Sequence, residues 1–224
     1  MEFSEKYHSA ESANHYYSKH VSGFWRRLSN RLEQHIARKA LMQAGNPGSV
    51  LDIPCGAGRF WNVLEENPSR KLIAMDNSQH MIDVALARQG TSGTRFETQQ
   101  ASAFAIPLAD NAVECIFCIR LVHHIGGHED RLALLQEFSR MASGSIIISL
   151  WVDGNYLAWR RKRKQTYRED HRYQNRFVIP ASVFENEVAE SGLRIEKRLD
   201  LFPYLSMWRT YVLRKQSCQV EQRH

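Results

Sequence analysis

Long apolar runs, the pattern of a leader sequence and a disulfide framework are all missing from this chain. No apolar stretch approaches a length of about 18 residues, which a helix needs to span a bilayer, and the longest candidate is the short segment 146–151. The first six residues lack the basic-then-apolar order of a signal peptide. Four cysteines do not make a disulfide framework in 224 residues. These absences predict a cytoplasmic protein without an integral membrane segment.

Two phosphate-binding motifs are also missing. A dinucleotide fingerprint, Gly-x-Gly-x-x-Gly, that begins at Gly56 would need its third glycine where Trp61 stands. That glycine normally permits close helix–strand packing beside a pyrophosphate. The Gly-Lys-Ser/Thr of a Walker loop does not occur either. The chain therefore lacks a cradle for a pyrophosphate or a triphosphate, which disfavours a nicotinamide-dependent oxidoreductase.

The sequence does contain a strand–turn–helix signature at residues 50–60. An apolar run ends at Asp52 and leads into a glycine-containing turn, and a second apolar run, 71–75, ends in Asp76. Open parallel sheets bind nucleotide-like ligands at the carboxyl ends of their strands, where a carboxylate can accept hydrogen bonds from ribose hydroxyls. A nucleoside without phosphates fits this pattern, and S-adenosylmethionine is the commonest such cofactor.

Four blocks of the sequence resemble, in order and at the usual spacings, the motifs of the class I S-adenosylmethionine-dependent methyltransferases. They are Asp-Ile-Pro-Cys-Gly-Ala-Gly at 52–58, Asp-Asn-Ser-Gln-His-Met at 76–81, Ala-Ser-Ala-Phe-Ala-Ile-Pro-Leu at 101–108, and Val-Glu-Cys-Ile-Phe with Leu-Val-His-His-Ile within 113–125. The last block resembles the Leu-His-His-Ile of a branch with small-molecule and tRNA enzymes. The resemblance covers roughly residues 48–214.

The resemblance also implies which residues bind the cofactor. Asp76 would hold the ribose, Gly56 and Gly58 would admit the methionine end, and residues 102–104 would surround the adenine. Arg120, at the end of the fourth strand, would form part of the floor near the methyl group. The predicted cofactor-binding set is Asp52, Pro54, Gly56, Gly58, Asp76, Asn77, Met81, Ser102, Ala103, Phe104 and Arg120.

Two positions depart from the family pattern. Pro54 stands where the first glycine is usual, and proline removes one backbone N–H donor from the turn. Ser102 replaces the Asp that holds the adenine amino group, although its oxygen can accept the same hydrogen bond. Asp52 either bonds the cofactor's ammonium group or ties down the glycine turn. The departures leave open a non-catalytic binding protein that keeps the fold.

His124 is the candidate catalytic residue. It lies after the fourth strand, and the resemblance implies that its imidazole acts as a general base on a hydroxyl or an amine. The alternative is that His123 and His124 only pack and cap the following loop, because methyl transfer often needs only proximity and in-line orientation. We expect no metal site, since Cys115 and Cys118 would face opposite sides of a strand and lack a second pair.

The order of elements predicts an α/β fold with a doubly wound, seven-stranded, mostly parallel sheet and an antiparallel C-terminal hairpin. Residues 1–47 would form an N-terminal helical cover, 48–214 the methyltransferase domain, and 215–224 a tail. The expected strands lie near 49–53, 71–75, 94–98, 113–119, 144–150, 193–201 and 207–214, and the expected helices near 59–66, 78–88, 128–141 and 181–191.

Positive charge is concentrated in one basic arm, residues 154–176. Eight basic residues there face two acidic ones, a net +6 that equals the net charge of the whole chain. The arm follows the fifth strand, so we interpret it as a lid that recognises an anionic substrate. The alternative is a solvated, amphipathic face.

The combined prediction is a methyltransferase that acts on O or N of a small or lipid-linked anionic acceptor. A tRNA-modifying or other RNA-modifying enzyme is the alternative, because lysine, arginine and interleaved aromatics also suit nucleic acid. A non-catalytic protein with the same fold is the third interpretation.

Overall fold

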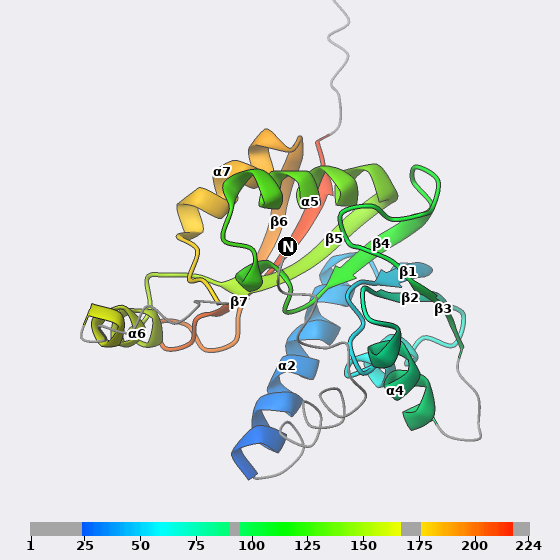
Figure 1. Ribbon diagram of the computed structural model, residues 1–224, viewed down its shortest axis with the longest axis horizontal. Coiled ribbons are helices and arrows are strands. Elements are labelled where there is room, and N and C mark those ends of the chain that lie inside the picture. Colours follow the sequence, from blue (N-terminus) through cyan, green and yellow to red (C-terminus); the bar gives the residue numbers. More distant parts are fainter. Residues whose placement is uncertain (1–23, 90–94, 167–175, 217–224) are drawn as a thin grey trace, which may run out of the picture.

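The computed structural model describes residues 24–89, 95–166 and 176–216. These residues form an open sheet of seven strands in the order β3-β2-β1-β4-β5-β7-β6 (Figure 1). The strands are β1 Ser49–Asp52, β2 Lys71–Asp76, β3 Phe96–Gln100, β4 Val113–Cys118, β5 Ala142–Trp151, β6 Leu193–Asp200 and β7 Trp208–Lys215. Strands β1 to β5 pair in parallel, and β7 runs antiparallel between β5 and β6. The predicted sheet with its antiparallel hairpin is confirmed.

Helices cover both faces of the sheet. The helices are α2 Phe24–Gln43, α3 Trp61–Leu64, α4 Gln79–Gln89, the 3-10 turn η3 Val122–His124, α5 His128–Met141, α6 Tyr156–Thr166 and α7 Ala181–Glu190. Helices α5 and α7 pack on one face, whereas α2, α3 and α4 contribute to the core on the other. Helix α6 projects away from both layers (Figure 1).

The two cores follow from the alternation of side chains along buried strands. Val50 and Leu51 are adjacent in β1 and both fully buried, yet they belong to different clusters. Val50 joins the cluster that contains Leu41 of α2, and Leu51 joins the cluster that contains Phe138 of α5. A parallel strand buried on both faces must therefore be apolar almost throughout, as the sequence is here.

Strand β1 lies between β2 and β4, which is the point where the order of strands along the sheet reverses. Ligands of open α/β sheets bind at such a point, beyond the carboxyl ends of the strands. Asp52 ends β1 and Asp76 ends β2, so the topology brings both carboxylates to this edge.

The element boundaries differ from the expected ones by a few residues. The expected helix 59–66 is the single turn α3, and the third strand begins at Phe96 rather than at 94. Cys115 and Cys118 lie in opposite core clusters, as predicted, so they do not form half of a metal site.

Parts of the predicted domains lie outside the described residues. The structure describes residues 24–47 of the N-terminal cover, and residues 1–23 lie outside. The same holds for 167–175 of the basic arm and for 217–224 of the tail. Among the described helices, none combines the length and apolarity that a membrane crossing requires.

Candidate cofactor and acceptor site

The glycine turn after β1 is held to the sheet by the backbone. The Cys55 N–H donates to the Met75 carbonyl at 2.9 Å, and the Gly58 N–H donates to the Cys55 carbonyl at 3.1 Å. Gly58 has a φ of +69°, and a Cβ there would lie 3.1 Å from Ala85 and 3.1 Å from the Trp61 ring. Only glycine adopts this φ without strain and also leaves room for Ala85 and Trp61. Gly58 therefore determines how closely the turn approaches α4.

Gly56 has a different role from Gly58. Its φ is +52°, but a Cβ there would meet only the end of the Met81 side chain, at 3.8 Å. Backbone conformation therefore requires glycine here, and the space above it is open. A ligand can approach this stretch of main chain closely.

Asp76 connects the glycine turn to the end of β2. One carboxylate oxygen accepts a hydrogen bond from the Gly56 N–H at 2.8 Å, and the other accepts one from the Ser78 N–H at 2.9 Å. Burial raises the pKa of Asp76, and these two hydrogen bonds act in the opposite direction. Each oxygen keeps a second lone pair, so the side chain can also accept hydrogen bonds from ribose hydroxyls.

Asp52 ties the turn to α3. Its carboxylate accepts a hydrogen bond from the Trp61 indole N–H at 3.1 Å, and burial raises the pKa of Asp52 well above its usual range. This contact matches the interpretation in which Asp52 fixes the turn. A bond to the cofactor's ammonium group stays a prediction.

The predicted adenine-binding residues lie beyond β2 and β3. The Phe104 N–H donates to the Ser102 hydroxyl at 3.2 Å, which bends the segment sharply, and Phe104 is 44% exposed. Ala103, between them, is buried.

The other predicted cofactor-binding residues differ in exposure. Met81 is buried, whereas Asn77 is exposed and its carbonyl accepts a hydrogen bond from Gln100. Pro54 is half-buried between β1 and the glycine turn.

The Arg120 side chain points toward the N-terminal helix. Its guanidinium donates to both oxygens of Glu33 of α2, at 2.7 and 3.1 Å, and lies 4.8 Å from the Trp208 ring centroid. Arg59, which follows the glycine turn, pairs with the same carboxylate at 3.1 Å. Burial alone would raise the pKa of Glu33, but Arg120 and Arg59 hold it below its usual value.

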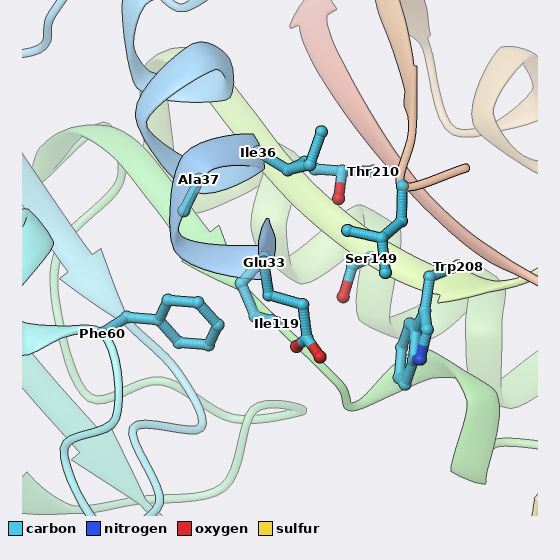
Figure 2. Close-up of a pocket in the computed structure, with 9 residues that line it drawn as sticks. Glu33, Ile36, Ala37, Phe60, Ile119, Ser149, Trp208 and Thr210 are labelled. Atoms are coloured by element: carbon cyan, nitrogen blue, oxygen red, sulfur yellow. The ribbon is translucent and has the colours of Figure 1, made fainter. Parts of the chain in front are cut away.

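A small pocket lies beside this ion-pair cluster, and Figure 2 shows Glu33 and Trp208 among the residues that line it. It opens between α2, the end of β4, β5 and the start of β7. Its lining residues are Glu33, Ile36, Ala37, Phe60, Ile119, Ser149, Leu201, Trp208 and Thr210. The Ser149 hydroxyl accepts a hydrogen bond from the Arg120 N–H at 3.0 Å, which fixes the end of β4 against β5.

An aromatic cluster with unpartnered polar atoms lies at the same edge of the sheet. Trp151 ends β5 and faces Trp208 across the antiparallel pair, with ring centroids 5.5 Å apart. The His123 ring lies 4.8 Å from Trp151 and 4.9 Å from Trp208. Within the described chain, His123 Nδ1 and Trp151 Nε1 are buried without a hydrogen-bond partner.

The two histidines differ. His123 is 3% exposed, and burial, helped by the charges of His124 and Arg120, lowers the pKa of His123 to about 2. It is therefore neutral at physiological pH. His124 is half-buried, with its ring 4.0 Å from that of His123. Its predicted role as general base stays a prediction.

Two arginines of the basic arm reach this cluster. Cζ of Arg161, in α6, lies 5.1 Å from the Trp151 ring centroid, and Cζ of Arg176 lies 5.9 Å from it. Arg161 also donates to the Arg176 carbonyl at 3.1 Å. Burial, followed by the charge of Arg176, lowers the pKa of Arg161. The site thus combines guanidinium groups with an unpartnered indole N–H, which are donors suited to an anion.

Sequence reasoning did not single out Glu33, Trp151 or Trp208. No local pattern indicates their contacts, because each of the three contacts a partner from a distant part of the chain. An acidic residue in an otherwise basic N-terminal helix was the only signal for Glu33.

Residues 50–143 match the family model described as a methyltransferase domain. Together with the strand order and the glycine turn, this match identifies residues 50–143 as a methyltransferase domain of the class I S-adenosylmethionine-dependent type. Magnesium protoporphyrin IX methyltransferase of Synechocystis PCC 6803, solved with bound S-adenosylhomocysteine, has the same fold. Its TM-score is 0.72 at 14% identity, over 87% of this chain and 89% of that one.

Two curated relatives are tRNA enzymes by name. The tRNA (carboxymethyluridine(34)-5-O)-methyltransferase ALKBH8 of Macaca fascicularis is 30% identical over 104 residues, which are 46% of this chain and 14% of that protein. Probable tRNA methyltransferase 9B of Bos taurus is 24% identical over 144 residues, 63% of this chain and 28% of that protein. The chain thus spans less than a third of the length of either relative.

Proposed function

We propose that this protein transfers a methyl group from S-adenosylmethionine to an oxygen or nitrogen of a small or lipid-linked anionic acceptor. Asp76 and the turn at Gly56 would hold the ribose and the methionine end, as the resemblance to the class I methyltransferases implies. The acceptor would lie beyond β4 and β5, against the aromatic cluster. When bound, the cofactor supplies an electrophilic methyl group on a sulfonium.

The observation that carries this proposal is the pair of guanidinium groups over Trp151. Cζ of Arg161 and Cζ of Arg176 lie 5.1 and 5.9 Å from its ring centroid, and its indole N–H has no hydrogen-bond partner among the described residues. A carboxylate or phosphate would accept a hydrogen bond from that donor and would lie close to the Arg161 guanidinium, whose Nε also has no hydrogen-bond partner among the described residues. Strand β5 runs parallel to β1 and β2, so Trp151 lies at the same edge of the sheet as Asp76.

The protein's contribution to the reaction is orientation. A lone pair of the acceptor would attack the methyl group in line, and the new O–CH₃ or N–CH₃ bond would form as the S–CH₃ bond breaks. His123 would remain neutral and would pack against the acceptor rather than exchange a proton. His124 is the candidate base where the acceptor is a hydroxyl or an amine, whereas a carboxylate acceptor would need none.

A tRNA-modifying activity is the second candidate. The names of two curated relatives and the exposed basic side chains of α6 favour it. A non-catalytic role is the third, motivated by Pro54 and Ser102, and S-adenosylhomocysteine binding by calorimetry separates it from the other two. Absence of binding would support the non-catalytic role.

The direct test uses S-adenosylmethionine with an isotopically labelled methyl group. The protein is incubated with a cell extract, which is then separated into RNA, protein, lipid and small-molecule fractions. Label in the lipid or small-molecule fraction, lost with Asp76→Ala, would support the leading proposal. Label in the RNA fraction would support the second candidate instead. Absence of both label and cofactor binding would contradict a methyltransferase activity.

A further inference from the structure

Helix α6 has two chemically different faces. On the inner face Ala158 is buried and Arg161 lies over Trp151. On the outer face Tyr156 and Trp159 are 51% and 53% exposed, with ring centroids 5.9 Å apart. Arg163 lies over the outer side of the helix, 4.9 Å from the Trp159 ring centroid. The inner face belongs to the proposed acceptor site, whereas the outer face has no role in it.

The loop between β6 and β7 extends the outer face. The Tyr156 N–H donates to the Tyr204 carbonyl at 2.9 Å, and the Leu157 N–H donates to the Leu205 carbonyl at 3.2 Å, so the loop is fixed to the first turn of α6. Figure 1 shows this loop and α6 side by side at one end of the molecule. Phe202, Tyr204 and Leu205 are 43%, 87% and 49% exposed.

Five large, exposed apolar or aromatic residues therefore lie on α6 and on the loop that is fixed to it. We call this set the outer patch, and it consists of Tyr156, Trp159, Phe202, Tyr204 and Leu205. A cluster of large exposed side chains on a globular domain marks an interaction surface. It is not needed for the sheet, whose two cores are complete without it.

The charge around the outer patch restricts its partner. Helix α6 contains no acidic residue, and its exposed basic residues are Arg160, Lys162, Arg163 and Lys164. A second copy of the chain would present the same positive charge and be repelled. The partner must therefore be anionic and must also accept apolar side chains.

We propose that the outer patch docks the protein on an anionic membrane surface. Tryptophan, tyrosine, phenylalanine and leucine beside lysine and arginine suit the boundary between headgroups and acyl chains. RNA would use the basic and aromatic groups, but the exposed Leu205 side chain would add little to its binding. Docking would bring the proposed acceptor site, on the inner face of α6, to within about one helix diameter of a membrane that carries a lipid-linked acceptor. In this respect the inference rests on the proposed function.

The test measures sedimentation of the full chain with vesicles. One set of vesicles is phosphatidylcholine alone, and the other contains about one third phosphatidylglycerol. We expect binding to the anionic vesicles only, weakened by salt. Arg160→Gln with Lys164→Gln should weaken it about 30-fold, and Trp159→Ala with Leu205→Ala about tenfold.

The matched control is Lys39→Gln with Lys197→Gln, which removes the same charge from exposed positions on α2 and β6. This control should change vesicle binding by less than about twofold. An equal effect of control and patch variants would mean unspecific charge attraction and would overturn the inference. Failure to bind anionic vesicles would overturn it as well.

Bulk tRNA is tested with the same variants. Loss of tRNA binding by the patch variants, with vesicle binding unchanged, would make this surface an RNA interface and overturn membrane docking. S-adenosylhomocysteine binding, measured in parallel, reports a folded cofactor site in each variant. Because neither vesicle binding nor cofactor binding requires turnover, failure of docking and failure of the proposed methyl transfer are separable.

Discussion

Glu33 and Arg120 lie 87 residues apart in the chain, and the Arg120 guanidinium donates to both carboxylate oxygens of Glu33, at 2.7 and 3.1 Å. Arg59 completes the cluster from the other side. Three segments meet there: the N-terminal helix, the residue after the glycine turn, and the end of β4. A single carboxylate thus couples the N-terminal cover to the cofactor turn.

Glu33→Gln should destabilise the protein by about 3 kcal/mol, because two partly buried guanidinium groups lose their counter-charge. Urea denaturation at neutral pH measures this change in the free energy of unfolding. Glu97→Gln, which breaks an exposed pair with Lys71, is the control and should cost less than about 1 kcal/mol. An equal cost for both variants would contradict the coupling role of Glu33.

The stabilisation by Glu33 should depend on pH. Its pKa is lowered in the folded state, so the stabilising charge is fully present above the unfolded-state pKa of about 4.3 and is lost as pH falls through the lower folded-state value. The difference between wild type and Glu33→Gln should therefore shrink in acid. If the difference in the free energy of unfolding grew in acid instead, a group other than Glu33 would be responsible for it.

Asp76→Asn should weaken S-adenosylhomocysteine binding by about 10–100-fold, because an amide cannot accept charge-assisted hydrogen bonds on both sides. The Gly56 and Ser78 N–H groups would also lose part of their anchor. Isothermal titration calorimetry gives the affinity. Asp83→Asn, an exposed carboxylate on α4, should leave it unchanged.

Gly58→Ala should cost about 3 kcal/mol, since a Cβ at a φ of +69° would also press against Ala85 and Trp61 at 3.1 Å. Gly154→Ala provides the matched comparison. Its φ is +75° but a Cβ there meets nothing within 4 Å, so only the backbone cost of about 1 kcal/mol applies. Denaturation of both variants separates packing from conformation, and equal costs would show that contact with α4 is unimportant.

His123→Phe should change the acid stability of the protein. The folded-state pKa of His123 is about 2. Below about pH 6.5, the unfolded chain therefore binds a proton at His123 that the folded state does not bind. Between about pH 7 and pH 5, wild type should lose about 2 kcal/mol relative to the variant. Parallel stability curves for the two proteins would mean that His123 is protonated in the folded state.

Arg161→Gln should raise the KM for a soluble acceptor about tenfold and leave S-adenosylhomocysteine affinity unchanged, because its guanidinium lies over Trp151 rather than near the glycine turn. Steady-state methyl transfer and calorimetry measure the two quantities. Arg194→Gln, on an exposed ion pair of β6, is the charge-matched control. Equal loss of acceptor use and cofactor affinity would mean that the arm is structural.

The strands, their parallel pairing and the cofactor turn could be predicted because each leaves a local mark in the sequence. Val50 to Asp52 form an apolar run that ends in a carboxylate, and Gly58 stands where a side chain would collide. Arg120 shows the limit of this reasoning. Its position after β4 was correctly placed, but its guanidinium pairs with Glu33 of α2, a partner that no spacing indicates.

The basic arm also shows that the sequence does not indicate which distant residues a side chain contacts. The sequence by itself determined its net charge and its place after the fifth strand, because charge and order along the chain are one-dimensional properties. Only the tertiary structure separated Arg161, which faces Trp151, from Arg160 and Lys164, which face solvent. That division depends on where the helix lies relative to β5 and the β6–β7 loop, and these contacts form only when distant segments pack together.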